Sequence, residues 1–374
     1  MKKVQMVSTG SYLPGDPIDN ETLERLAGPL PDEVLEGIQV KTRHWSIDPE
    51  TGEHNESNSE MATKAVGEAL ELAGMEAGEL DLIVVSTASP EYHLPATATF
   101  VQEQLGLRRC AAIDIRSGCA GAVEALDLAR SYLERGDFEN AVVVGSEAIS
   151  PLSAPVYLGK DPAKVRMRDR LGIYNFGDGA GAMVLRAVAG ADDGIRGSAV
   201  ACVGGEKKPG MQVIGGATHA PITTQLKAKR LIELKVDVVE SAKFIPHVLT
   251  EGMKDTLERS GVGADDVSIC VIPEGNAGYM TDELREAGLL TPEWLTLEPK
   301  IYENLALVGA TGSAAVPLAL DHAWKNGVIA PGDVVMLLAI ETSKWKYGGL
   351  VLDWTAAPVP AGRALSQMGA VGVG

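Results

Sequence analysis

Hydrophobic and polar positions along the chain form two alternating patterns, and the same order of patterns occurs in each half. Short β-branched runs predict buried strands at residues 82–87, 141–146, 182–186, 267–272 and 334–340. Apolar residues recurring at helical spacing predict helices at residues 59–72, 122–135, 238–260 and 311–326. Short strands between helices of this length are typical of an α/β fold in which helices cover the sheets. The repeated order of elements indicates an internal duplication.

Two segments interrupt this order and set the expected organisation of the chain. Residues 203–235 combine glycine-rich stretches with a basic, helix-like stretch, which predicts an inserted loop and short helix of the kind that covers a pocket. Residues 355–374 are rich in Ala, Pro and Gly and predict a frayed tail. The expected units are therefore residues 1–202, the insertion at 203–235, residues 236–354 and the tail at 355–374.

Composition narrows the class of protein. A chain of 374 residues with 45% hydrophobic content can bury a large core. The four cysteines lie far apart, without metal-ligand spacing or a disulfide framework, so we expect free thiols and no metal site. The start of the chain lacks a signal-peptide pattern, and no run approaches the roughly 20 apolar residues that a membrane helix needs. We expect a cytoplasmic protein without a membrane partner.

The formal net charge of −18 bears on possible partners. Such a surface repels nucleic-acid phosphates, so we expect no nucleic-acid partner. It also repels acidic carrier proteins unless a local basic patch offsets the charge. Residues 160–170 contain five basic residues in eleven and are one candidate for such a patch. The alternative is that this segment forms an ordinary solvated surface.

Cys119 is the residue with the strongest chemical signal. It lies where an apolar strand, residues 111–115, gives way to a helix that continues from Val123. The first free N–H groups of a helix and its positive dipole end favour a thiolate at this position. Gly118 and Gly121 permit a tight turn and the close approach of a substrate. The alternative is that Cys119 is a small buried hydrophobic residue, as most unpaired cysteines are.

Several motifs together indicate a known family. They are Gly37-Ile-Gln-Val-Lys-Thr-Arg, Thr87-Ala-Ser-Pro with Leu94-Pro95, the cysteine motif at 114–121, Val144-Gly-Ser-Glu, Asp169-Arg170 and Phe176-Gly-Asp-Gly-Ala-Gly. Over residues 1–354 the chain resembles β-ketoacyl-acyl carrier protein synthase III enzymes of the thiolase superfamily. The resemblance implies a duplicated five-layer α-β-α-β-α fold and a homodimer. It also implies ping-pong acyl transfer from a thioester of coenzyme A or of an acyl carrier protein, with no other cofactor.

The resemblance assigns roles to individual residues. Cys119 becomes the acylated nucleophile, and its backbone N–H forms half of the oxyanion hole. Leu94 matches a position that reaches across the dimer and bounds the acyl pocket. Arg170 matches an arginine that contacts the coenzyme A nucleotide. The strand end that lends the second oxyanion donor corresponds to Glu341-Thr-Ser343, so Ser343 is assigned to substrate binding.

The chain departs from the family pattern at three places. Glu274 stands where the family has histidine in Pro-His-Gln-Ala-Asn, and Ala310 stands where it has asparagine in Gly-Asn-Thr-Ser-Ala-Ala. The glycine-rich strand end is replaced by Glu341-Thr-Ser-Lys-Trp. In the family, the histidine and asparagine donate hydrogen bonds to the enolate that malonyl decarboxylation leaves. Because an ionised glutamate only accepts hydrogen bonds, ordinary decarboxylative elongation is disfavoured.

We therefore expect an acyltransferase or condensing enzyme of specialised, polyketide-type biosynthesis. In this hypothesis Glu274, oriented by Asn276, is a general base that activates a carbon, oxygen or nitrogen nucleophile of a small or carrier-bound acceptor. The alternative role for Glu274 is a salt bridge or a solvent-facing position. His219, on the glycine-rich insertion, is the candidate histidine for substrate contact. Two other functions stay open, namely a conventional initiating ketosynthase and a non-catalytic partner subunit of an active homologue.

Overall fold

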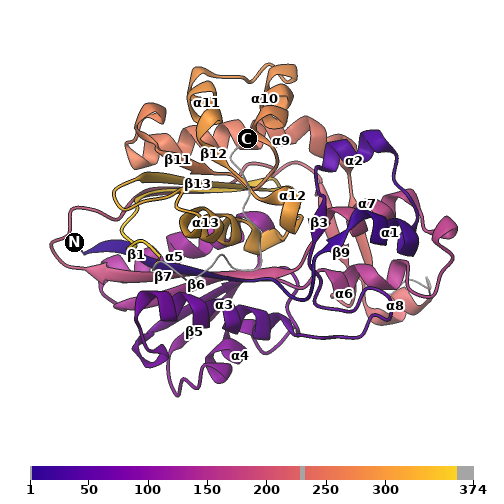
Figure 1. Ribbon diagram of the computed structural model, residues 1–374, viewed down its shortest axis with the longest axis horizontal. Coiled ribbons are helices and arrows are strands. Elements are labelled where there is room, and N and C mark those ends of the chain that lie inside the picture. Colours follow the sequence, from indigo (N-terminus) through magenta and orange to yellow (C-terminus); the bar gives the residue numbers. More distant parts are fainter. Residues whose placement is uncertain (1, 228–231, 360–374) are drawn as a thin grey trace.

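The computed structural model describes residues 2–227 and 232–359, which form five layers (Figure 1). Two five-stranded sheets enclose a central helical layer, and further helices cover the outer face of each sheet. The first sheet has the order β1-β7-β6-β4-β5, with bounds Lys3–Tyr12, Gly179–Val188, Asn140–Glu147, Leu82–Ser86 and Ala111–Ile115. The second has the order β12-β11-β13-β14-β8, with bounds Ile301–Tyr302, Ile269–Val271, Val334–Glu341, Lys346–Asp353 and Ile195–Cys202. The predicted five-layer α/β fold is confirmed.

The two halves share one strand order, which bears out the internal duplication. Counted along the chain within its own half, each sheet has its strands in the order third, second, fourth, fifth, first. The fifth strand is antiparallel to the fourth in both, as the β6–β7 and β13–β14 pairings show. Because β8 is the first strand of the second sheet, the boundary between the halves lies before residue 195, earlier than the expected 202.

Two helices that lie back to back between the sheets make up the central layer (Figure 1). They are α5 (Gly121–Arg135) and α13 (Ala315–Lys325), each following the third strand of its half. Leu126 on α5 and Leu320 on α13 are fully buried in one core cluster with strand residues of both sheets. The predicted helix at 311–326 starts late because residues 312–314 form a separate 3₁₀ turn.

The outer helices are close to those that the pattern predicts. On the first sheet they are α3 (Asn58–Ala73) and α4 (Thr97–Gln104), and on the second α9 (Val238–Ser260), α10 (Ala277–Glu286) and α11 (Pro292–Leu297). The prediction of a helix at 238–260 is confirmed to the residue. At one end of the layers lies a cluster of smaller elements, α1 (Asn20–Ala27), α2 (Asp32–Ile38), α6 (Ser150–Ser153) and α7 (Met167–Asn175) (Figure 1).

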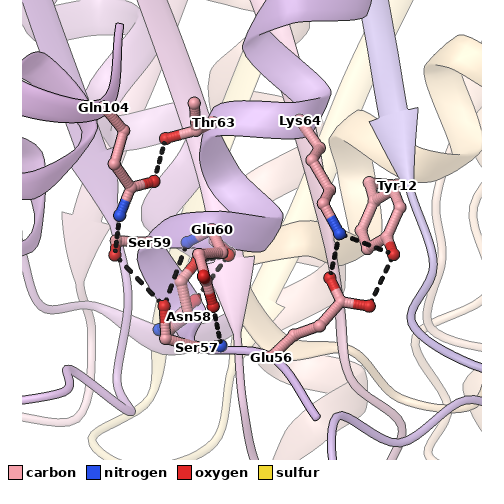
Figure 2. A network of polar contacts seen from close by, with 10 residues as sticks. Tyr12, Glu56, Ser57, Asn58, Ser59, Glu60, Thr63, Lys64 and Gln104 are labelled. Carbon is pink, nitrogen blue, oxygen red and sulfur yellow. Dashed lines mark hydrogen bonds and ion pairs between the residues drawn. The ribbon is translucent and has the colours of Figure 1, made fainter.

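The start of α3 is fixed by polar contacts, several of which are shown in Figure 2. Ser57 and Glu60 form a reciprocal capping box, which satisfies the first N–H groups of the helix. Asn58 donates from Nδ2 to Thr87 Oγ1 and to the carbonyl of Ser89, both at 2.9 Å. These bonds hold the loop that follows β4. Figure 2 also shows the adjoining cluster of Tyr12, Glu56 and Lys64.

The insertion forms the strands β9 (Met211–Ile214) and β10 (Glu233–Val236) and the short helix α8 (Ile222–Lys227). β9 and β10 pair as an antiparallel ribbon. The beginning of the insertion is attached to the turn after β13. Lys344 Nζ donates to the carbonyl of Gly204 at 3.0 Å, and Trp345 Nε1 donates to that of Lys208 at 2.8 Å. The insertion therefore borders residues 341–346.

The prediction of a frayed tail was wrong for its first residues. Thr355 donates from its hydroxyl to the carbonyl of Met6 at 2.6 Å, and Ala356 is buried in the core. Residues 360–374 lie outside the described residues. Within the described ranges, no helix has the length and apolar character needed to span a membrane, and no His, Cys, Asp and Glu side chains group as metal ligands would.

Candidate active site

Cys119 lies on a tight elbow between β5 and α5, as its sequence context predicts. A 3₁₀ turn, Gly118–Ala120, joins the two elements, and the Cys119 side chain is half-buried. Gly118 has a φ of +51°, and a Cβ at this position would lie 1.8 Å from Glu341 Oε2. Glycine is therefore required for both the backbone conformation and the approach of the Glu341 carboxylate.

The second half of the chain carries an equivalent elbow. Gly312–Ala314 forms a 3₁₀ turn before α13, and Gly312 has a φ of +53°. By position in the duplicated fold, Ser313 corresponds to Cys119. Ser313 Oγ donates to the carbonyl of Gly118 at 2.9 Å, so the two elbows are in contact at the centre of the molecule. A reactive sulfur occupies one elbow and a hydroxyl the other.

Glu341, the last residue of β13, binds the backbone of Cys119. Its Oε2 accepts the Cys119 N–H at 2.6 Å, and its Oε1 accepts the Ser343 N–H at 2.6 Å. The family resemblance assigns to the oxyanion hole the Cys119 N–H and a donor from the strand end that contains Ser343. In this structure one carboxylate therefore occupies both of these backbone positions.

Glu147, the last residue of β6, is the counterpart of Glu341 in the first half. It accepts the N–H of Ala88 at 2.9 Å, the N–H of Ser313 at 3.2 Å and the hydroxyl of Ser89. Each carboxylate thus binds the N–H at the elbow of the opposite half. Glu147 is fully buried within this set of donors, which is typical of a structural group.

Glu274 lies just beyond β11 and is bound by the neighbouring strand. Its Oε1 accepts the N–H of Ile340 at 3.0 Å. The expectation that Asn276 orients Glu274 was wrong, because Asn276 caps α10 and its Oδ1 accepts the N–H of Gly278 at 2.9 Å. Asn276 is exposed, and no hydrogen bond joins it to Glu274 in the described part of the chain.

The electrostatics of the site oppose a resting thiolate. Burial raises the pKa of the Cys119 thiol well above its ordinary value, and the negative charges of Glu341, Glu274 and Glu147 raise it further. The expected stabilisation of a thiolate is present, because the Cys119 backbone N–H lowers the pKa, but burial and the three carboxylates outweigh it. The same N–H also donates to Glu341.

Burial also acts on the carboxylates. It raises the pKa of Glu274 to about 7, against the opposing effect of the Ile340 N–H and with a further increase from Glu341. It raises the pKa of Glu147 as well, although the donors around that group lower it. Near neutral pH, Glu274 is therefore divided between its charged and neutral forms.

Arg170 and Leu94, predicted to contact substrate, have different surroundings. Arg170 is half-buried on α7 and donates to the carbonyls of Pro29 at 2.8 Å and Pro162 at 3.0 Å. A phosphate would have to share the guanidinium with these carbonyls. Leu94 is 85% exposed in the loop before α4.

The histidines offer no replacement for the residue missing from the family motif. His219, the candidate from the insertion, is exposed on a turn. His44 and His322 are buried but bound elsewhere, to the carbonyls of Pro14 and Gly15 and to the Tyr302 hydroxyl. The remaining histidines, His54, His93 and His247, are exposed.

Comparison with known proteins decides the family. The model of 3-oxoacyl-[acyl-carrier-protein (ACP)] synthase III matches residues 113–204, and the model of its C-terminal part matches residues 257–354. A β-ketoacyl-[acyl-carrier-protein] synthase III of Caldanaerobacter subterraneus is 30% identical over 350 residues, covering 94% of this chain and 97% of that protein. The chain belongs to the β-ketoacyl-[acyl-carrier-protein] synthase III family.

Other members of the family extend the comparison. A relative from Rhizorhabdus wittichii is 31% identical and covers 91% of this chain and 96% of its own. Among solved structures, the synthase III of Aquifex aeolicus has a TM-score of 0.73 at 26% identity, covering 95% of this chain and all of that one. A tetronic acid condensing enzyme has a TM-score of 0.77 at 29% identity, covering 94% and 99%. The thiolase-like fold extends over nearly the whole chain.

Sequence reasoning did not assign two of the glutamates around Cys119 to the site. Glu147 was noted only as part of a motif, and Glu341 only as part of an altered strand end. The signal for Glu341 was present, because it replaces the first residue of a glycine-rich segment that approaches the reacting atoms. The contact between the Glu341 carboxylate and the Cys119 N–H becomes visible only in the folded structure, where β13 pairs with its neighbours.

Proposed function

We propose that this synthase III family member is an acyltransferase or condensing enzyme of specialised, polyketide-type biosynthesis. It takes an acyl group from a coenzyme A or carrier-protein thioester onto Cys119 and passes it to a carbon, oxygen or nitrogen nucleophile. The proposal depends on one observation. Cys119 is surrounded by Glu147, Glu274 and Glu341, where decarboxylation of malonyl would require donors to a developing negative charge.

The first half-reaction is a thiol exchange. The Cys119 sulfur attacks the thioester carbonyl, the bond from that carbon to the donor sulfur breaks, and the donor leaves as a free thiol that takes up the cysteine proton. No malonyl carboxylate is lost in this step. The product is an acyl-enzyme in which the acyl carbon lies next to the carboxylates of the site.

The second half-reaction uses Glu274. Its carboxylate takes the proton of the acceptor as the acceptor attacks the acyl carbon, and the Cys119 sulfur leaves and regains a proton. A general base works best when its pKa is near the operating pH, and burial raises the pKa of Glu274 to about 7. The bond from the Ile340 N–H fixes one oxygen of the carboxylate and leaves the other for the acceptor.

Surface charge and surface exposure support a proposal for how the donor docks and for the oligomeric state. Because the chain carries a net charge of −18, an acidic carrier needs the basic segment at 160–170 for docking.

For the oligomer we propose a homodimer. Strand β5 is a half-exposed sheet edge, and the nearby Leu94 is 85% exposed, which favours pairing with a second copy.

A non-catalytic partner subunit is the second candidate. The observation that favours it is the Glu341 carboxylate on the Cys119 N–H, which leaves the elbow without a free donor in this state. The retained cysteine on its glycine elbow opposes it, because a supporting subunit has no need of a half-exposed thiol there. Formation of an acyl-enzyme separates the two.

Release of carbon dioxide tests the non-decarboxylative chemistry. The wild type is expected to release none from malonyl-coenzyme A or a malonyl carrier above the level of Cys119→Ala. The double variant Glu274→His with Ala310→Asn restores the family residues and is expected to gain this activity. Decarboxylation by the wild type at a rate at or above that of the double variant would instead identify a conventional ketosynthase.

A further inference from the structure

The carboxylate of Glu341 is held more weakly than its counterpart in the first half. Glu147 has hydroxyl donors from Ser89 and Thr87 in addition to backbone N–H groups. Glu341 accepts two backbone N–H groups, and no hydroxyl or cation binds it in the part of the chain that the structure describes. The two carboxylates occupy equivalent positions, but Glu341 binds the N–H of Cys119 whereas Glu147 binds that of Ser313.

The nearby lysines do not neutralise Glu341. Lys346, directly opposite Glu341 in the β13–β14 hairpin, is paired with Glu124 at 2.5 Å. Lys344 donates to backbone carbonyls of the insertion, including that of Gly204. The charge of Glu341 is thus directed at the elbow, where its Oε2 accepts the Cys119 N–H.

This position creates a conflict with acylation. A thioester oxygen becomes an anion during attack by the Cys119 sulfur and needs the Cys119 N–H as a donor. Glu341 holds that N–H at 2.6 Å. A carboxylate binds an N–H more strongly than a neutral carboxyl group does, because the charge of the acceptor strengthens the bond. Protonation of Glu341 would therefore free the donor that the substrate needs.

The same step meets a second need of the site. The Cys119 thiol must lose its proton before it can attack, and burial and the surrounding glutamates hold it in the neutral form. The histidines are bound elsewhere or exposed. Glu274 is bound to the neighbouring strand by the Ile340 N–H, and no hydrogen bond joins it to Cys119 among the described residues. Glu341 is the carboxylate that binds Cys119, through the backbone N–H at 2.6 Å, and is therefore the candidate acceptor for that proton.

We propose that Glu341 is the base of the acylation half-reaction and, through the same protonation, the group that opens the oxyanion hole. The proton moves from the Cys119 sulfur to Glu341 Oε2, which weakens the bond to the Cys119 N–H. The thioester oxygen then takes that N–H while the sulfur attacks, and the donor thiol leaves with the proton from Glu341. The proton taken from Cys119 leaves with the donor thiol, and Glu341 is again an ionised carboxylate. This inference rests on the proposed function and assigns a different base to each half-reaction. Glu341 is the base of acylation, and Glu274 is the base of acyl transfer to the acceptor.

The charged groups that face this step come from five elements. They are Glu341 at the end of β13, Glu274 beyond β11, Glu147 at the end of β6, and the Lys346–Glu124 pair across β14 and α5. The glutamates disfavour any additional negative charge, so a proton that passes between Cys119 and Glu341 conserves the charge of the site. Loss of the cysteine proton to solvent would add a negative charge to the site.

Two rates measured on the same variants test the proposal. Acylation of Cys119 by an accepted thioester is followed by intact-protein mass spectrometry, and alkylation by iodoacetamide at pH 8 reports the thiolate without needing the oxyanion hole. Glu341→Gln keeps the shape but cannot take the proton, so acylation should slow by about 100-fold. The same variant removes a negative charge beside the sulfur, so alkylation should become several-fold faster. Glu50→Gln, an exposed carboxylate, is the matched control and should change neither rate.

A second variant distinguishes a Glu341 that acts as a base from a Glu341 that only blocks the Cys119 N–H. Glu341→Ala frees the N–H but removes the base, so acylation should stay slow and should recover in a saturable way when formate is added. Faster acylation in Glu341→Ala, or acylation and alkylation rising together in Glu341→Gln, would overturn the proposal while leaving the acyl-enzyme established. Absence of any acyl-enzyme in the wild type would overturn the proposed function and this inference with it.

Discussion

Replacing histidine with glutamate at position 274 changes both the chemistry and the stability of the site. The side chain is half-buried, its negative charge raises the pKa of Cys119, and it accepts the Ile340 N–H. Its pKa is raised from 4.5 to about 7, so the folded state holds the proton more tightly than the unfolded chain does. Stability is therefore fully present below pH 4.5 and is lost as the pH rises toward 7. The charged form that acts as base in the proposed reaction therefore destabilises the fold.

Glu274→Gln is predicted to remove both effects. The shift of the pKa from 4.5 to about 7 corresponds to about 3 kcal/mol of stability lost in the wild type between those pH values. The variant should lack this loss and be more stable than the wild type at pH 8, measured by urea unfolding at pH 5 and pH 8. It should still form the acyl-enzyme but pass the acyl group on at least about 100-fold more slowly. Equal pH dependence in both proteins would exclude the raised pKa.

Individual residues also show where prediction from the sequence stops. The elbow at Cys119 was predicted because a strand pattern gives way there to helical spacing, and the 3₁₀ turn at Gly118–Ala120 confirms it. Asn276 was misassigned, since a residue just before a helix serves its own N–H groups first. Glu341 was not assigned because its contact with Cys119 joins residues that are 222 positions apart.

At the scale of elements, the elbow before each central helix controls the site. The 3₁₀ turns at Gly118–Ala120 and Gly312–Ala314 place Cys119 and Ser313 against each other, and each elbow N–H meets a glutamate of the opposite half. Helix periodicity predicted the helices but not these turns, because a three-residue turn has no periodic pattern. The turns explain why α13 begins at Ala315 and not at residue 311.

Gly118→Ala is predicted to disable this elbow. The added Cβ would lie 1.8 Å from Glu341 Oε2, and the φ of +51° is unfavourable for alanine. We expect a loss of about 1–3 kcal/mol in the free energy of unfolding and a fall of about 100-fold or more in acylation. Gly136→Ala, at the far end of α5 with a positive φ of 81° and open space around it, is the control for backbone strain alone. Comparable acylation in the two variants would contradict the importance of the Glu341 contact.

At the scale of the whole molecule, the duplication brings two sheets and two central helices around one cysteine. Hydrophobic patterns predicted the repeated order of elements, and the two sheets confirm it by a shared strand order. The boundary at residue 202 was placed too late because a strand pattern does not reveal which sheet the strand joins. The insertion was found from its composition, but its attachment to the turn after β13 depends on contacts distant in sequence.

The charge distribution of the whole chain gives a prediction about the donor. Arg166 and Arg168 are more than half exposed on the basic segment of an otherwise acidic molecule. Their replacement by glutamate should raise the KM for an acyl carrier protein about tenfold at low salt, with a smaller effect at 0.5 M salt and little effect on an acyl-coenzyme A. Arg135→Glu, at the far end of α5, is the control. An unchanged KM for the carrier would remove this segment from the docking surface.

The central claim is that Cys119 carries the acyl group, and intact-protein mass spectrometry tests it most directly. The wild type, Cys119→Ala and Glu274→Gln are incubated with a panel of acyl-coenzyme A and acyl-carrier thioesters. We expect at least one donor to add a single acyl mass to the wild type, no addition to Cys119→Ala, and a longer-lived adduct on Glu274→Gln. No adduct with any donor, or an adduct that persists in Cys119→Ala, would contradict the account.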